Sequence, residues 1–103
     1  MSAGYCYIWE YEVKPDCEAA FERLYGPEGS WVALFRRADG YQATELHRDL
    51  DRPRRYLTVD YWRSAEDSAA FKRDFASECE LLDLEGDSLT EREHYLGGFT
   101  PAG

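Results

Sequence analysis

The chain has 103 residues, a formal net charge of −9 and three cysteines, and 16% of its residues are aromatic. This length predicts a single domain spanning residues 1–103, and the negative charge argues against a nucleic-acid or anionic-membrane partner, because phosphate groups attract basic surfaces. The odd cysteine count without a CxxC pair, and the absence of a signal segment or long apolar run, predict a reduced, cytoplasmic protein.

The first part of the chain predicts a strand followed by two helical segments. Tyr5–Val13 alternates large aromatic residues with a second face, which is typical of a strand. A proline ends that strand, and Asp16 is a candidate N-cap for a helix that continues to about Tyr25. After a glycine-rich break, we expect Ser30 to cap a short helical piece over residues 31–37.

The segment from Gly40 to Phe71 predicts a β-hairpin and the start of a capped helix. Strands are expected at residues 41–49 and 56–62 because both runs are rich in β-forming residues. The polar, proline-containing residues 50–55 between them suit a turn. The two strands are therefore expected to pair antiparallel.

A helix and a last strand complete the predicted fold. Ser64 opens a sequence similar to a capping box, with Asp67 in place of the usual glutamate. An apolar stripe continues from there to Leu82, as on an amphipathic helix. Residues 84–88 are expected to form a loop, and residues 93–99 the last strand.

The order of elements predicts an α+β fold of the ferredoxin-like βαββαβ type, with a four-stranded antiparallel sheet and helices on one face. The strands carry large side chains on both faces, for example Leu57 and Tyr61 against Tyr56 and Trp62. A chain of this length has nothing left to cover the second face, so a homodimer with sheet against sheet is expected. The alternative is a monomer with an amphipathic outer face.

Two polar side chains in the hairpin are candidate catalytic residues. If the hairpin pairs in register around its turn, His47 lies opposite Thr58, and Glu45 lies opposite Asp60 on the same face. A histidine near two carboxylates has a raised pKa, so His47 and Asp60 are candidates for acid–base catalysis. The alternative is a solvated or dimer-facing polar patch, and a register error of one residue removes the arrangement.

The surplus of aromatic residues predicts a flat, apolar pocket between sheet and helices for a small hydrophobic or aromatic ligand. The alternative is a core that is simply rich in aromatic residues. The candidate substrate-binding residues are Tyr7, Trp9, Trp31, Tyr41, Trp62 and Phe71.

The remaining charged and metal-ligating residues give weaker signals. Arginines gather around the hairpin turn at positions 48, 52, 54 and 55, with two more at 36 and 37. Such a cluster binds a carboxylate or phosphate, or pairs with acidic residues of a partner subunit. His47 and His94 lie on different predicted strands, and no HxH, HxxxH or CxxC spacing occurs, so no metal site is expected.

The chain resembles the antibiotic biosynthesis monooxygenase superfamily. The resemblance rests on WEYEVKP at residues 9–15, Gly40-Tyr41, Asp51-Arg52-Pro53, the strand ending in Asp60-Tyr61-Trp62, and Ser64 with the helix through Phe71. It implies a dimeric α+β barrel and a monooxygenase without a cofactor that acts on a small aromatic or polyketide-like compound. A non-catalytic homodimer that binds a small ligand is the alternative, because this fold hosts several functions.

One position departs from the pattern of that superfamily. Many members carry a histidine nine residues after the strand-ending tryptophan, and here that residue is Phe71. Residues 65–82 contain no histidine, so the axial ligand that haem-degrading relatives use is missing from this helix. The departure argues against haem chemistry and favours the non-catalytic alternative.

Overall fold

The structure is a computed structural model that describes residues 4–103. Its elements in chain order are β1 (Tyr5–Val13), α1 (Glu18–Tyr25), α2 (Ser30–Phe35), β2 (Tyr41–Arg48), β3 (Arg55–Trp62), α3 (Ala65–Asp74), α4 (Ala76–Asp87) and β4 (Thr90–Phe99). The predicted βαββαβ order is confirmed, with each helical position occupied by two consecutive helices.

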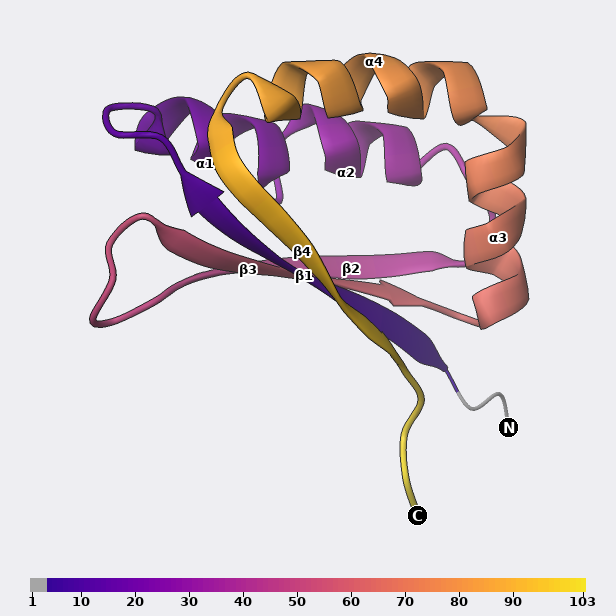
Figure 1. Ribbon diagram of the computed structural model, residues 1–103. Coiled ribbons are helices and arrows are strands. Elements are labelled where there is room, and N and C mark those ends of the chain that lie inside the picture. Colours follow the sequence, from indigo (N-terminus) through magenta and orange to yellow (C-terminus); the bar gives the residue numbers. More distant parts are fainter. Residues whose placement is uncertain (1–3) are drawn as a thin grey trace.

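The four strands form one antiparallel sheet in the order β2-β3-β1-β4. Helices α1, α2 and α4 lie over one face of this sheet, and α3 stands at one end of it (Figure 1). The predicted fold class is therefore confirmed. Among the described residues, no helix is long and apolar enough to cross a membrane.

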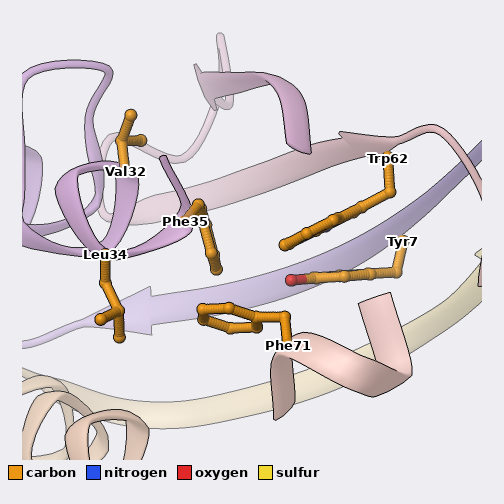
Figure 2. Packing of buried hydrophobic residues seen from close by; sticks show 6 residues of the cluster. All are labelled: Tyr7, Val32, Leu34, Phe35, Trp62 and Phe71. Carbon is orange, nitrogen blue, oxygen red and sulfur yellow. The ribbon is translucent and has the colours of Figure 1, made fainter. Parts of the chain in front are cut away.

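The face of the sheet under the helices holds the core. Because successive strand residues point to opposite faces, alternate residues of β1 and β3 lie on this face, and most of them are buried, including Tyr11 and Tyr56. One cluster gathers Phe21 and Leu24 of α1 around these two tyrosines. In the second cluster, the Tyr7, Trp62 and Phe71 rings from β1, β3 and α3 converge on Phe35 of α2 (Figure 2).

The hairpin register differs from the prediction by one residue. His47 pairs with Leu57, and Thr44 rather than Glu45 pairs with Asp60. The cause lies in the turn, where the Asp49 N–H donates to the Arg55 carbonyl at 2.9 Å and the Asp49 carboxylate accepts from two following N–H groups at 2.8 and 3.1 Å. Since a shift of one residue reverses the face of every side chain, the predicted grouping of His47 with Asp60 is wrong.

The C-terminal third also departs from the prediction. Residues 84–88 do not form a loop, since α4 continues through Asp87, and β4 begins at Thr90. Gly86 keeps the helix close to α1, because a β-carbon there would collide with the Tyr25 hydroxyl. The apolar stripe through Leu82 is interrupted by a break at Phe75, whose backbone (φ −117°, ψ 28°) separates α3 from α4.

The predicted helix caps are correct in one case of three. Ser64 Oγ accepts the Asp67 N–H at 3.1 Å, which confirms the cap of α3. Asp16 does not cap α1, because it adopts a left-handed backbone with φ 68° and the N-cap is Cys17. Ser30 is already the first residue of α2 and follows Gly29 as N-cap.

Candidate active site

A cavity of about 330 Å³ lies between the sheet and the helices. Its wall is largely aromatic and consists of Tyr7, Trp9, Tyr11, Tyr25, Trp31, Phe35 and Phe71. Its polar lining consists of Thr44, Thr58, Asp60, Lys72, Cys79, Asp83, Asp87 and Glu93. An aromatic hollow with few polar groups is the usual form of a site for a small organic molecule.

The aromatic wall is held in place by ring contacts between elements. Trp31 of α2 stacks near Tyr25 of α1, with ring centroids 6.3 Å apart, and lies 5.7 Å from Phe35. Phe35 in turn meets Phe71 of α3 edge-on at 5.2 Å. On the sheet side, Trp9 stacks on Tyr11 at 6.2 Å. These contacts fix flat rings on opposite sides of the cavity.

Asp60 is the buried ionisable group of the cavity. Only 5% of its surface is exposed, and burial raises the pKa of its carboxyl group from the ordinary 3.8 to about 6, although the Thr44 hydrogen bond and the Lys72 charge oppose that rise. Thr44 Oγ1 donates to Asp60 Oδ1 at 2.6 Å. Because the Thr44 hydroxyl has one proton, Tyr41 donates to it at 2.8 Å. A hydrogen-bond chain from β2 therefore orients the carboxylate.

Lys72 supplies the cavity with its positive charge. Its ammonium group lies 4.7 Å from the centre of the Tyr7 ring, a distance suited to a cation–π contact. Its charge also lowers the pKa of Asp60. Among the described residues, Lys72 makes no ion pair within 4.0 Å. The ammonium group thus stabilises a carboxylate or a developing anion in the cavity.

The tyrosines of the cavity wall are neutral at physiological pH. Burial raises the pKa values of the Tyr7, Tyr11 and Tyr25 hydroxyls far above their usual range. The neighbouring Trp31 side chain opposes part of the rise in the pKa of Tyr25. The buried Trp31 Nε1–H group makes no hydrogen bond within residues 4–103. The wall therefore offers phenol and indole donors to a polar atom of a ligand.

The predicted substrate-binding residues divide into two groups. Tyr7, Trp9, Trp31 and Phe71 line the cavity. Trp62 does not, because it is fully buried behind the wall and packs on Phe35 and Phe71 at 5.6 and 5.3 Å.

Tyr41 also lies off the wall, 5.5 Å from Trp62, and acts only through its hydrogen bond to Thr44. Trp62 and Tyr41 therefore support the site from behind, and neither is in position to touch a ligand in the cavity.

His47 lies on the opposite face of the sheet from the cavity. Its side chain is 58% exposed, and Nε2 is 3.3 Å from Glu45 Oε1. This exposed pair of His47 and Glu45 fits the alternative of a solvated polar patch. A catalytic His47 would have to contact the cavity, and it is not among the residues that line it. The shifted register, which places Leu57 opposite His47, is the reason.

Several cavity residues were not predicted from the sequence. The sequence did not indicate Thr44, because its pairing with Asp60 depends on the observed register. Asp83 and Asp87 lie on α4, part of which was expected to be a loop, and Glu93 lies within β4 rather than at its start. Lys72 follows the stripe residue Phe71 directly, and nothing in the spacing marked it.

The arginine-rich hairpin is paired within the chain. Arg52 donates to Glu12 at 2.7 Å, and Arg55 binds Glu10 and, at 2.8 Å, Asp49. Arg54 lies 3.3 Å from Glu91. These pairs occupy the cluster without a ligand or a partner subunit. Within the described part of the chain, no group of three or more His, Cys, Asp or Glu side chains is placed to hold a metal ion.

Comparison with known proteins agrees with this geometry. The family model described as antibiotic biosynthesis monooxygenase matches residues 5–74. SnoaB, a cofactor-independent oxygenase from Streptomyces nogalater, superimposes with a TM-score of 0.78 at 20% identity, over 98% of this chain and 95% of that one.

Two further solved structures are similar. A candidate antibiotic biosynthesis monooxygenase from Bordetella bronchiseptica has a TM-score of 0.73 and 27% identity, covering 97% of this chain and 98% of that chain. A conserved protein from Methanosarcina mazei has a TM-score of 0.71 and 13% identity, over 95% and 92% respectively. No curated protein matches. The match to the family model covers more than half of the sequence, and the chain belongs to the antibiotic biosynthesis monooxygenase family.

Proposed function

We propose that the protein is a cofactor-independent monooxygenase that acts on a small aromatic or polyketide-like compound bound in this cavity. The observation that carries the proposal is Asp60, a buried carboxyl group on the wall of an aromatic hollow, with its pKa raised to about 6. Membership of the family and the likeness to SnoaB support the reaction class.

Asp60 is the proposed general base. With a pKa of about 6 it is largely ionised at neutral pH, yet it is a stronger base than an ordinary aspartate. It removes a proton from an activated C–H group of the substrate, and Lys72 offsets the negative charge that develops. His47, the histidine predicted from the sequence, has no part in this step because it lies on the other face.

The deprotonated substrate supplies the electrons for oxygen. It transfers one electron to O₂, and the resulting radical pair combines to form a C–O bond in a hydroperoxide. Loss of water from the hydroperoxide leaves a carbonyl group, so a CH₂ group and O₂ become C=O and H₂O. Asp60 returns the first proton to the peroxide anion, which gives the hydroperoxide. The Asp60 carboxylate then removes the second proton from the same carbon as the O–O bond breaks, and this proton joins the departing hydroxide to form water. The apolar wall keeps bulk water from the intermediate.

We also propose that the protein is a homodimer joined through the outer face of the sheet. That face carries Ile8, Leu57 and Tyr61, which are half-buried although no helix covers them. A second copy placed against this face covers these side chains by the same contacts in both directions. Light scattering during size-exclusion chromatography tests the proposal: a mass of one chain contradicts it.

A ligand-binding homodimer without catalysis is the second candidate. Phe71 favours it, because it packs against Phe35 and Trp62 at a position where many relatives carry a titratable histidine. Such a protein needs the aromatic cavity but no base. The two candidates differ only in whether a bound substrate consumes oxygen.

Oxygen uptake with anthrone as the substrate separates them. We expect Asp60→Asn to lower kcat/KM by about 100-fold or more, since loss of a general base has an effect of that size, while His47→Gln leaves it unchanged. Equal rates in wild type and Asp60→Asn contradict the role of Asp60. Binding of anthrone without oxygen uptake supports the non-catalytic candidate.

A further inference from the structure

We infer that the ligand of this cavity is an aromatic compound that carries a protonated amine. The inference rests on the proposed function only in taking the cavity as the place where the substrate binds. Three features of the described residues support it: a carboxylate cluster at the open side, a buried carboxyl group inside, and aromatic rings between them.

The carboxylate cluster consists of Asp83 and Asp87 on α4 and Glu93 on β4. All three line the cavity and are also exposed to solvent, so they lie where the cavity meets the surface. Within residues 4–103 they make no ion pair, whereas most acidic residues of the outer sheet face are paired with arginine. Partial burial and then the charges of neighbouring acids, Asp87 among them, raise the pKa values of Asp83 and Glu93, although the Lys72 charge opposes part of the rise at Asp83. A bound cation relieves this repulsion.

The interior of the cavity gives an independent indication. Asp60 is 5% exposed and lines the cavity. Its Oδ1 atom accepts from Thr44, but its other oxygen has no hydrogen-bond donor within the described chain. This oxygen is therefore free to accept a hydrogen bond from a ligand that enters the cavity. The cavity therefore presents negative charge at its open side and in its interior.

Aromatic rings lie beside the carboxylate cluster. The charges of Glu93, Asp83 and Asp87 all act on the Tyr25 hydroxyl, which places this cluster around the Tyr25 end of the wall. Trp31 stacks near Tyr25. Ring faces next to carboxylates bind ammonium groups, because the quadrupole of the ring and the negative charge attract the same cation.

The charge balance of the lining excludes the opposite type of ligand. Four carboxyl groups line the cavity, namely Asp60, Asp83, Asp87 and Glu93, against one ammonium group, that of Lys72. A ligand with a carboxylate or phosphate group is repelled at the opening. An ammonium group held at Tyr25 leaves the aromatic body beside the other rings of the wall, such as Phe35 and Phe71, within the same cavity that Asp60 lines.

Three naphthalene derivatives of similar shape test the inference by isothermal titration calorimetry at neutral pH. Naphthylmethylamine is a cation, naphthylmethanol is neutral and naphthoate is an anion. We expect the cation to bind at least about 10-fold more tightly than the alcohol, the anion to bind most weakly, and the preference for the cation to shrink in high salt. Equal or weaker binding of the amine, or no binding of the amine, overturns the inference.

A pair of double variants assigns the preference to the carboxylate cluster. Asp83→Asn with Glu93→Gln is expected to weaken binding of the amine about 10-fold and leave binding of the alcohol unchanged, which also shows that the cavity is intact. The control, Glu85→Gln with Glu91→Gln, changes the same net charge on α4 and β4 outside the cavity lining. An equal loss in the control overturns the inference.

The two proposals fail in different ways. If the amine binds selectively but no amine-bearing substrate consumes oxygen, the monooxygenase proposal fails and the ligand class stands. If neutral and anionic phenols are oxidised as efficiently as their amine-bearing counterparts, the ligand class fails and the monooxygenase proposal stands.

Discussion

The two faces of the sheet come from alternate residues of the same strands, yet they shift the pKa of an acidic side chain in opposite directions. On the helix-covered face, burial raises the pKa of Asp60 to about 6. On the outer face, the Arg55 guanidinium holds the pKa of Glu10 below its usual range. A carboxylate paired with arginine is stable and inert, whereas a buried one with a single neutral donor is a base. A shift of one residue in the strand register would move an acidic side chain from one of these environments to the other.

The largest difference between the faces is expected in packing. Trp62→Ala removes a fully buried ring of the helix-covered face, and we expect the free energy of unfolding to fall by about 3–5 kcal/mol. Arg92→Ala, which removes an exposed ion pair with Glu12 on the outer face, is expected to lower it by less than about 1 kcal/mol. Urea denaturation measures both, and similar losses contradict the contrast.

The pH dependence of stability distinguishes Asp60 from the paired acids. Because its pKa is raised from 3.8 to about 6 in the folded state, the folded chain holds a proton that the unfolded chain has lost. Stability therefore falls as pH rises between these values, by ~3 kcal/mol. Glu10, with a lowered pKa, gives the opposite slope.

Urea denaturation of wild type and Asp60→Asn at pH 4 and pH 7 measures this contribution. We expect the asparagine variant to gain stability relative to wild type at the higher pH. A relative stability that does not change with pH contradicts the raised pKa.

The close approach of α4 to the Tyr25 wall depends on Gly86. A β-carbon at this position collides with the Tyr25 hydroxyl, so Gly86→Ala is expected to lower the free energy of unfolding by about 1–3 kcal/mol and to weaken binding of naphthylmethylamine. Calorimetry with Ser88→Ala as a neighbouring control measures the binding effect. Unchanged stability and affinity show that the helix has room to move.

A further, small effect is expected at the cap of α3. Ser64→Ala removes the acceptor of the Asp67 N–H, which is expected to lower the free energy of unfolding by about 1 kcal/mol. The cavity is not in contact with Ser64, so oxygen uptake should be unchanged. A large loss of activity would mean that α3 shifts as a whole.

Local patterns were sufficient for the fold but insufficient for the site. Alternation in β1 predicts the buried face that holds Tyr7 and Tyr11, and the Ser64 cap predicts where α3 begins, because both depend only on neighbouring residues. The face of His47 depends on side-chain hydrogen bonds of Asp49 in the turn, which no periodicity reveals.

The carboxylate cluster was hidden for a similar reason. Residues 84–88 look like a loop in the sequence, and their helix is held by the contact between Gly86 and Tyr25, which are far apart in the chain. Asp83 and Glu93 come together only because that helix turns back into β4. Positions that depend on such distant contacts require the structure.

The pH dependence of oxygen uptake tests the central claim, that buried Asp60 is the base, most directly. We predict that kcat/KM with anthrone rises through a pH of about 6 in the wild-type protein and in His47→Gln, following the ionisation of Asp60. In Asp60→Asn this rise should be absent and the rate low throughout. A rise at the same pH in Asp60→Asn would contradict the account.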